Sequence, residues 1–333
     1  MTSRRVTLIP GDGIGPEIVS ASMPVLHAAA PDLEWDEVEA GESAYERRGV
    51  ALPNDVVESV RHHGLCVKGP MGVPMTGYTS PNSRLRAELG LWCNVRVASS
   101  FDGARTRFPG TEIVIIRDVT EDTRGAEQPI GPDAGVKLKF ITRRGAERVA
   151  RYAYSYALHH GLNRVTVANQ APTNRATDGL FLAAAMDVAE EFPDLKIAGE
   201  AMDVLTMHLA LDPLAYQILL CPSSYGGVLA GLCSGITGGV GMMPGFNTDG
   251  ERTTVFEPGH GNAPKYAGLQ RANPIGFLLS GVLLLEHIGL DRAAKQVRTA
   301  VADVMREGRT LPVDQGGHAT TNEVMAAVLA AMR

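Results

Sequence analysis

The chain has 333 residues, of which 44% are hydrophobic and 20% charged, and its formal net charge is −6. This composition is ordinary for a soluble globular protein of one large or two average domains. The acidic balance argues against a nucleic-acid-binding surface, and the longest apolar run, near residues 275–285, is too short to span a membrane.

Strand-like and helix-like segments alternate along the chain. In chain order, we predict a strand at 6–9, a helix at 17–29, a strand at 112–116, a helix at 145–159, a strand at 164–168, a helix at 179–191, a strand at 218–221 and a helix at 275–289. The last helix is apolar nearly all round, which predicts that it is buried. This alternation favours an α/β fold.

The N-terminal segment and the cysteines both bear on where in the cell the protein is located. Too few apolar residues follow Arg4 and Arg5 to form a signal-peptide core. The cysteines are scattered without a C-x-x-C pair, which favours reduced core residues over a disulfide or a metal site; they are Cys66, Cys93, Cys221 and Cys233. We therefore expect a cytoplasmic protein.

A glycine-rich turn, Gly11-Asp12-Gly13-Ile14-Gly15, lies between the first predicted strand and helix. It could be interpreted as a dinucleotide-binding fingerprint with Glu34 or Asp36 as the ribose-binding acid. However, the third glycine comes one residue too early for G-x-G-x-x-G. The alternative is a tight strand-to-helix turn that requires glycine for its backbone conformation.

The longer phrase from Ile9 to Glu17, IPGDGIGPE, is more specific, and further motifs follow it in order. They are Lys68-Gly69-Pro70, Ser80-x-Asn82-x-x-x-Arg86, Asn94-x-Arg96, Ile115-Ile116-Arg117-Asp118, Thr177-Asp178-Gly179, His260-Gly261-Asn262-Ala263-Pro264, Asn273-Pro274 and Gly316-Gly317-x-Ala319-Thr320. Together they resemble the β-decarboxylating dehydrogenases, the isocitrate and isopropylmalate dehydrogenase family, over residues 6–322.

The resemblance implies two α/β domains flanking a cleft, and not a Rossmann fold. We expect the large, nucleotide-side domain at 1–96 and 242–333. The small domain, with an arm and a dimer interface, is expected at 97–241. Family sites form across a homodimer, so a homodimer is the expected assembly.

The substrate-binding positions of the family are kept. Arg86, Arg96 and Arg117 fall on its three carboxylate-binding arginines, and guanidinium groups bind carboxylates in bidentate fashion. Ser80 and Asn82 fall on its two polar substrate contacts. The resemblance therefore implies that the chain binds a small anionic ligand, a carboxylate or a phosphate.

The nucleotide loop is also kept, and its residues are His260, Gly261, Asn262, Ala263, Lys265, Tyr266 and Asn273. Members specific for NAD usually carry an acidic residue where Lys265 stands. The pair Lys265-Tyr266 resembles the NADP-type loop, in which a cation meets the 2′-phosphate. The resemblance thus favours NADP as the dinucleotide cofactor.

The catalytic and metal positions are largely lost. Of three metal-binding aspartates, only Asp203 is present, and Gly227 and Gly231 occupy the other two positions. One carboxylate makes a poor site for Mg²⁺ or Mn²⁺. Gln170 replaces the catalytic lysine and Arg124 the catalytic tyrosine, and neither exchanges protons readily near neutral pH. Metal-dependent oxidative decarboxylation is therefore not expected.

Three hypotheses follow for the function. The first is a repurposed enzyme that runs metal-independent, non-redox chemistry such as elimination, isomerisation or cyclisation, with Asp118, Asp203 and Tyr225 as candidate acid/base groups. The second is a regulatory or binding subunit that assembles with a catalytic sister chain. The third is a conventional NAD(P)-dependent hydroxy-acid dehydrogenase that uses substitute residues. No nucleic acid or membrane partner is expected.

Overall fold

The computed structural model describes residues 4–72, 80–123 and 127–332. The chain divides into two compact units. Unit 1 comprises Met1–Leu91, Ser99–Gly110 and Thr237–Arg333, and unit 2 comprises Trp92–Ala98 and Thr111–Ile236. Relative to the expected domains, residues 92–96 group with unit 2, and residues 99–110 and 237–241 group with unit 1.

Unit 1 is built on a five-membered run of strands in the order β2-β1-β3-β12-β11. Their bounds are β1 Arg4–Ile9, β2 Leu33–Glu37, β3 Leu65–Lys68, β11 Pro244–Thr248 and β12 Thr254–Pro258. β1 pairs in parallel with β2 and β3, and β3 pairs in parallel with β12. Only β11 and β12 form an antiparallel hairpin among these pairs.

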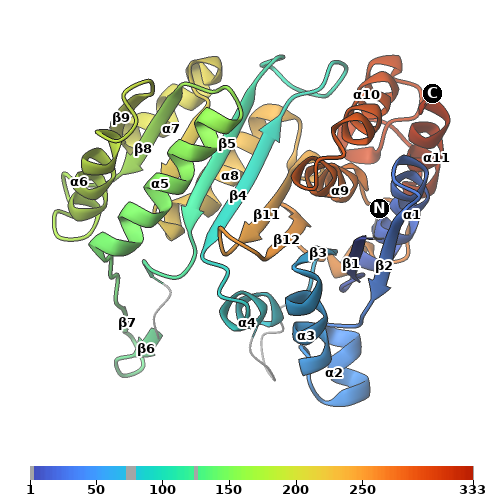
Figure 1. Cartoon of the computed structure of the whole chain (residues 1–333), viewed down its shortest axis with the longest axis horizontal. Coiled ribbons are helices and arrows are strands. Elements are labelled where there is room, and N and C mark those ends of the chain that lie inside the picture. Colours follow the sequence, from blue (N-terminus) through green and yellow to red (C-terminus); the bar gives the residue numbers. More distant parts are fainter. Residues whose placement is uncertain (1–3, 73–79, 124–126, 333) are drawn as a thin grey trace. The chain divides into compact units, whose positions relative to one another are not determined.

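The helices of unit 1 are α1 Gly15–Ala29, α2 Glu42–Arg48, α3 Asn54–His63, α4 Pro81–Glu88, α9 Ile275–His287, α10 Asp291–Glu307 and α11 Thr321–Ala331, with short 3-10 turns η2 Val240–Met242, η3 Pro264–Tyr266 and η4 Val313–Gln315. Every residue from Ile275 to Leu285 in α9 is buried, as its uniformly apolar sequence predicts. α9 packs against α1, α10, β11 and β12 and forms the centre of this core (Figure 1).

Unit 2 carries its strands in the order β4-β5-β10-β8-β9. Their bounds are β4 Cys93–Ser99, β5 Glu112–Asp118, β8 Arg164–Asn169, β9 Lys196–Ala201 and β10 Ile218–Cys221. β10 pairs in parallel with β5 and with β8, and β8 pairs in parallel with β9. The helices are α5 Arg143–His159, α6 Asp178–Ala189, α7 Met202–Leu211 and α8 Ser223–Thr237, with the turn η1 Pro213–Ala215.

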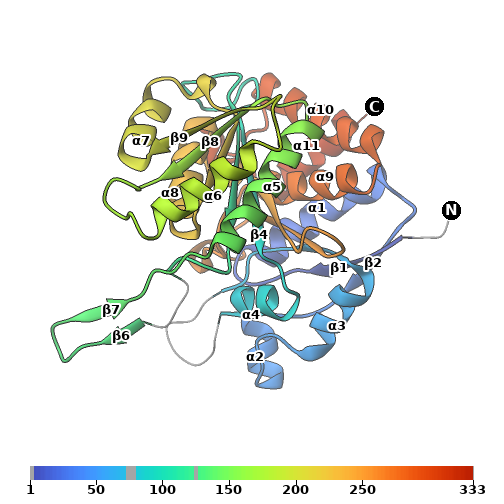
Figure 2. The same ribbon diagram turned by 60° about the vertical axis from the view of Figure 1, so that its left-hand side comes forward.

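An arm belongs to unit 2. The short strands β6 Glu127–Pro129 and β7 Gly135–Lys137 pair in antiparallel fashion and form a two-stranded sheet of their own. Figure 2 shows this hairpin extending away from the other elements of unit 2. Its apolar side chains are largely exposed, including Ile130 at 60% and Leu138 at 72%.

The elements predicted from periodicity are confirmed. Each predicted strand lies within or coincides with β1, β5, β8 or β10, and each predicted helix overlaps α1, α5, α6 or α9. Parallel strands alternating with helices confirm the α/β class. The four cysteines are buried thiols, in agreement with the expectation of reduced core residues.

Candidate functional site

The glycine turn after β1 is shaped by close backbone contacts. Gly11 has a φ of +77°, and a Cβ added there would lie 2.3 Å from the carbonyl oxygen of Pro70. Gly13 has a φ of +60°, and its Cβ would lie 2.0 Å from the carbonyl oxygen of Asn262. Only glycine tolerates both the left-handed backbone and this proximity. The tight-turn interpretation is therefore confirmed, and the turn supports the loop that contains Asn262.

The predicted nucleotide loop lies between β12 and α9. Lys265 and Tyr266 lie in η3 and are exposed, with the Lys265 ammonium 4.9 Å from the centre of the Tyr266 ring. His260 and Ala263 are partly exposed, and Gly261 is exposed. An exposed cation beside an aromatic ring on a loop suits a phosphate-bearing nucleotide.

Asn273 at the end of this loop is buried and anchors it. Its amide nitrogen lies 3.1 Å from each carboxylate oxygen of Asp314, and its Oδ1 accepts the N–H of Ile275 at the start of α9. Burial raises the pKa of Asp314, against the opposing effect of the Asn273 hydrogen bond. Asn273 thus fixes the loop to η4 and α9.

The predicted substrate residues of unit 1 lie at α4. The Ser80 hydroxyl caps the helix by accepting the N–H of Ser83 at 3.4 Å. The Asn82 side chain donates to the carbonyl of Met71 at 3.1 Å, and Arg86 lies on the same helix with an Nη2 atom 3.4 Å from the Ser83 hydroxyl. The N-cap and the first turn therefore carry both polar contacts predicted from the sequence.

The other two arginines lie on adjacent strands of unit 2. Arg117, on β5, donates from Nε to Oδ1 of Asn94 at 2.9 Å and from Nη1 to the carbonyl of Ser223 at 3.0 Å. Asn94 and Arg96 are two residues apart on β4, so their side chains leave the strand on the same face. Arg96 and Arg117 thus lie on neighbouring strands of unit 2, and Arg117 lies beside the first turn of α8.

The positions of two lost metal ligands lie on α8. Gly227 and Gly231 are four residues apart and share one face of the helix. A Cβ at Gly227 would have Arg117 Nη1 as its nearest neighbour at 3.8 Å, and a Cβ at Gly231 would meet nothing within 4 Å. This face therefore offers an arginine and open space where hard oxygen ligands would be required.

Asp203, the remaining metal-ligand position, lies in the first turn of α7 and is exposed. Across the described residues, no three His, Cys, Asp or Glu side chains gather closely enough to hold a metal ion. Within the described residues, the family's three metal-ligand positions therefore offer a single carboxylate, which does not fit a Mg²⁺ or Mn²⁺ ion bound as in the family.

Asp118, a candidate acid/base group, is buried and heavily hydrogen-bonded. Its carboxylate accepts from Arg148 at 2.8 Å, from the N–H and hydroxyl of Thr120 at 2.6 and 2.7 Å, and from the N–H of Glu121 at 3.0 Å. Arg148 also lies over the ring of Trp92, with Cζ 4.3 Å from its centre. These contacts favour an anchoring role for Asp118 at the end of β5.

Gln170, at the position of the family's lysine, lies next to a polar cluster that the sequence did not indicate. Its backbone N–H donates to Oδ2 of Asp178 at 3.1 Å. The same carboxylate accepts the Tyr225 hydroxyl at 2.5 Å and the Lys139 ammonium. Arg124, at the position of the family's tyrosine, lies outside the described residues. Asp178 stands in a quoted motif, but no sequence signal marked Lys139.

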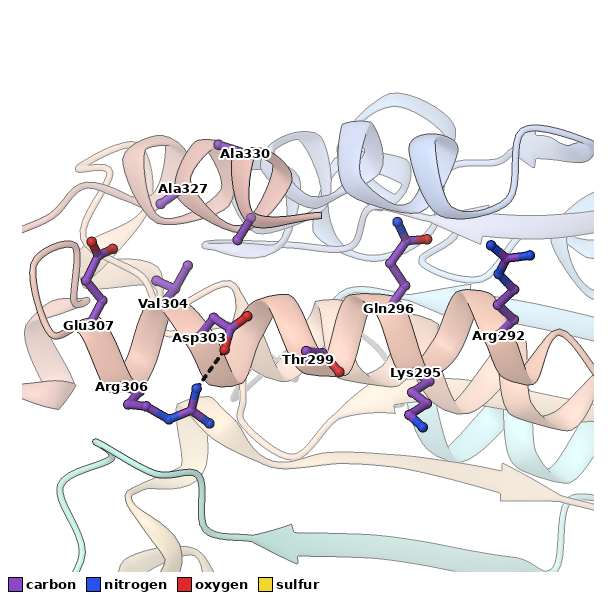
Figure 3. A pocket seen from close by; sticks show the side chains of 11 residues that line it. Arg292, Lys295, Gln296, Thr299, Asp303, Val304, Arg306, Glu307, Ala327 and Ala330 are labelled. Carbon is purple, nitrogen blue, oxygen red and sulfur yellow. Dashed lines mark hydrogen bonds and ion pairs between the residues drawn. The ribbon is translucent and has the colours of Figure 1, made fainter. Parts of the chain in front are cut away.

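A groove of about 1100 Å³ lies elsewhere, between α10 and α11 of unit 1 (Figure 3). Its wall on α10 carries Arg292 and Lys295 toward one end and Asp303 and Glu307 toward the other, and α11 contributes alanines. None of the residues predicted from the sequence lines this groove.

Comparison with known proteins agrees with this architecture. The family model described as isocitrate/isopropylmalate dehydrogenase matches residues 5–328. The chain belongs to the isocitrate/isopropylmalate dehydrogenase family, and it has that family's α/β fold.

Two relatives and one solved structure illustrate the similarity. The chain is 37% identical to "Isocitrate dehydrogenase [NAD] catalytic subunit 5, mitochondrial" of Arabidopsis thaliana, covering 97% of this chain and 87% of that protein. It is 35% identical to "Isocitrate dehydrogenase [NAD] subunit alpha, mitochondrial" of Macaca fascicularis, covering 96% and 92%. The crystal structure of isocitrate dehydrogenase from Methylococcus capsulatus superposes with a TM-score of 0.95 at 35% identity, covering 99% of each chain.

The helices of residues 4–72, 80–123 and 127–332 include none that is both long and apolar enough to cross a membrane.

Proposed function

We propose that this chain binds a small anion, a carboxylate or a phosphate ester, through Arg96 and Arg117, with Arg86 as a third contact inferred from the sequence. We further propose that it acts on this anion without a divalent metal, by non-redox chemistry such as elimination, isomerisation or cyclisation. The observation that carries the proposal is that Arg117 lies beside the face of α8 on which Gly227 and Gly231 stand in place of carboxylates.

The charge balance at this face supports metal-free anion binding. In a family site, a divalent cation and its aspartates would stand beside the arginines. Here Gly227 and Gly231 contribute no charge, so the guanidinium of Arg117 faces no carboxylate from either position. An anion could bind Arg117 at this face directly, through charge-assisted hydrogen bonds.

A dinucleotide is the second ligand in this proposal, with NADP favoured over NAD. Lys265 is exposed and could approach a 2′-phosphate, which NAD lacks. The named relatives are NAD-dependent, so a nicotinamide cofactor has support from the family at large. Because the proposed chemistry is non-redox, the dinucleotide would be a bound ligand and not a hydride carrier. The chain's contribution would be to hold the phosphate through Lys265 and Tyr266.

The assembly in this proposal is a homodimer in the cytoplasm. Exposed apolar side chains line α7 and the turn after it, namely Val204, Met207, Leu211 and Leu214. The exposed hairpin of β6 and β7 adds further apolar surface to unit 2. Such surface is rarely left uncovered. The alternative of a hetero-oligomer draws support from relatives whose printed names describe subunits.

Thermal-shift titration with citrate, isocitrate, pyrophosphate, NADP and NAD, each with Mg²⁺ or with EDTA, tests the proposal. A ligand that binds only the folded state stabilises it by about 2.7 kcal/mol at one hundred times its Kd. Stabilisation by a carboxylate or pyrophosphate in EDTA is expected, and Arg96→Gln should remove it. Arg144→Gln, an exposed arginine on α5, is the matched control.

Two results would redirect the assignment. Stabilisation that requires Mg²⁺, with NADP or NAD reduction on isocitrate, would establish the conventional dehydrogenase suggested by the names of the relatives. Stabilisation only after mixing with a catalytic isocitrate dehydrogenase chain would instead establish a regulatory subunit.

A further inference from the structure

A buried polar cluster in unit 2 joins four segments that are distant in sequence. The Asp178 side chain is 0% exposed and receives hydrogen bonds from the Lys139 ammonium and from the Tyr225 hydroxyl, the latter at 2.5 Å. Lys139 Nζ also lies 3.3 Å from the Tyr225 hydroxyl oxygen and 3.6 Å from Oδ1 of Asp122. The Asp122 side chain is 1% exposed.

The backbone of Asp122 indicates that this cluster is held in place against local preference. Its φ is +72°, a left-handed conformation that non-glycine residues adopt at an energetic cost. Its Oδ2 accepts the N–H of Ser224 at 2.5 Å, and its Oδ1 makes no hydrogen bond within the described structure. Strained residues of this kind concentrate at functional sites.

The pKa values of two members of the cluster, Lys139 and Tyr225, are both raised. Burial alone would lower the pKa of Lys139, but the hydrogen bond to Asp178 and the two nearby carboxylates outweigh it, so the pKa is raised. Burial and the hydrogen bond to Asp178 raise the pKa of Tyr225, against the opposing effect of Lys139. Near neutral pH, the ammonium is therefore charged and the phenol carries its proton.

The cluster also lies near the anion-binding arginine. The peptide group between Ser223 and Ser224 donates its N–H to Asp122, and its carbonyl accepts from Arg117. Lys139 is 19% exposed, and Tyr225 is partly exposed, so neither is sealed in the core.

We propose that Tyr225 is the catalytic proton donor of this chain, acting on a small dicarboxylate with an enol or enolate next to a carboxylate, and that Lys139 and Asp178 are its positioning residues. This inference rests on the proposed metal-free anion binding. Asp178 orients the phenol, and Lys139 stabilises the phenolate that forms. In the family, by contrast, positions 170 and 124 would carry the proton-transfer groups, and this chain has Gln170 and Arg124 there.

The proton balance closes without an oxidant or reductant. The O–H bond of Tyr225 breaks and a C–H bond forms on the enol carbon of the ligand. The enol hydroxyl proton leaves to solvent as the ketone forms. The phenolate takes a proton from the Lys139 ammonium, and the resulting amine is reprotonated by water.

Ketonisation of enol-oxaloacetate, followed by the ultraviolet absorbance of the enol in the presence of EDTA, tests this step. The wild-type chain should accelerate the reaction. Tyr225→Phe should lower the catalysed rate by about 100-fold or more, the lower range for a positioned proton donor. Its thermal shift with citrate should stay unchanged, because the arginines are untouched.

Lys139→Gln tests the positioning role through the pH profile. Lys139 and Asp178 are the charged groups that contact Tyr225, and Asp122 faces Lys139. Removing the cation leaves the two carboxylates, so the pKa of Tyr225 should rise further. The alkaline limb of the rate profile should then move to higher pH and the rate should fall. Lys137→Gln, on the exposed strand β7, is the control and should change neither.

The outcomes separate the two proposals. A citrate shift in EDTA with no acceleration by the wild type, or with equal acceleration by Tyr225→Phe, would overturn the role of Tyr225 while anion binding stands. An unmoved alkaline limb in Lys139→Gln would overturn the positioning role of Lys139. Absence of both the citrate shift and the acceleration would overturn the anion-binding proposal as well.

Discussion

Arg117 and Asp122 hold opposite sides of one peptide group. Arg117 Nη1 donates to the carbonyl of Ser223 at 3.0 Å, and Asp122 Oδ2 accepts the N–H of Ser224 at 2.5 Å. The first turn of α8 is thereby fixed between a cation on β5 and a buried carboxylate that lies four residues after the end of that strand. The glycines of α8 follow directly from this fixed turn.

Those glycines give a matched pair of stability predictions. Gly231→Ala should stabilise the chain by about 0.5–1 kcal/mol, because alanine is favoured in a helix interior. Its Cβ would meet nothing within 4 Å. Gly226→Ala should destabilise it, because a Cβ there would lie 2.2 Å from Cδ of Arg117. Urea denaturation of both variants measures this. Equal changes of the same sign would contradict the geometry.

A buried ion pair in unit 1 predicts that one substitution will cause a larger loss of stability. Lys68 Nζ lies 2.5 Å from Oε2 of Glu257, and the two side chains are only 4% and 7% exposed. Lys68→Met should lower the free energy of unfolding by about 3–5 kcal/mol, because it leaves a buried carboxylate without its cation.

The double variant Lys68→Met/Glu257→Gln provides the control for that prediction. A neutral amide can still accept the hydrogen bond that Asn247 now donates to Glu257 at 2.8 Å. Most of the lost stability should therefore return, as measured by the denaturation midpoint. A double variant no more stable than Lys68→Met would show that the loss comes from packing around residue 68.

The exposed face of α7 predicts self-association. Leu211 is 70% exposed, and Met207 on the same helix is 50% exposed. Leu211→Asp should convert a dimer to a monomer in sedimentation velocity, because a charge would be buried in the interface. Val50→Asp alters an apolar residue of unit 1 that is 41% exposed, and should leave the dimer intact. A monomeric wild-type chain would rule out the proposed homodimer.

The nucleotide loop predicts a cofactor preference. Lys265→Glu should abolish the thermal stabilisation by NADP, since a carboxylate repels the 2′-phosphate, and should leave or improve that by NAD. Lys295→Glu is the control, because it makes the same charge change at an exposed lysine of α10, away from the loop. It should leave both stabilisations unchanged. Stronger stabilisation of the wild type by NAD than by NADP would instead align the chain with its named relatives.

The sequence by itself determined the elements and the local turns. Strand β10 begins and ends where its apolar run predicts, and α9 is buried because its residues are apolar on every side. Gly11 and Gly13 were recognisable as a tight turn, since left-handed backbone leaves few alternatives to glycine. The motif order placed Arg117 directly after a predicted strand, and the structure includes it in β5.

Only the tertiary structure decided which side chains contact the site residues. From the sequence, Asp118 was a candidate acid/base group. The structure shows that its carboxylate is hydrogen-bonded to several groups, among them Arg148, which lies thirty residues away in the sequence. Lys139 reaches Asp178 across 39 residues and Tyr225 across 86, and Asp122 reaches Ser224 across 102. Periodicity reports which face of an element is buried. Which distant side chains meet there depends on how the strands are ordered and where each loop ends, and no local pattern encodes that.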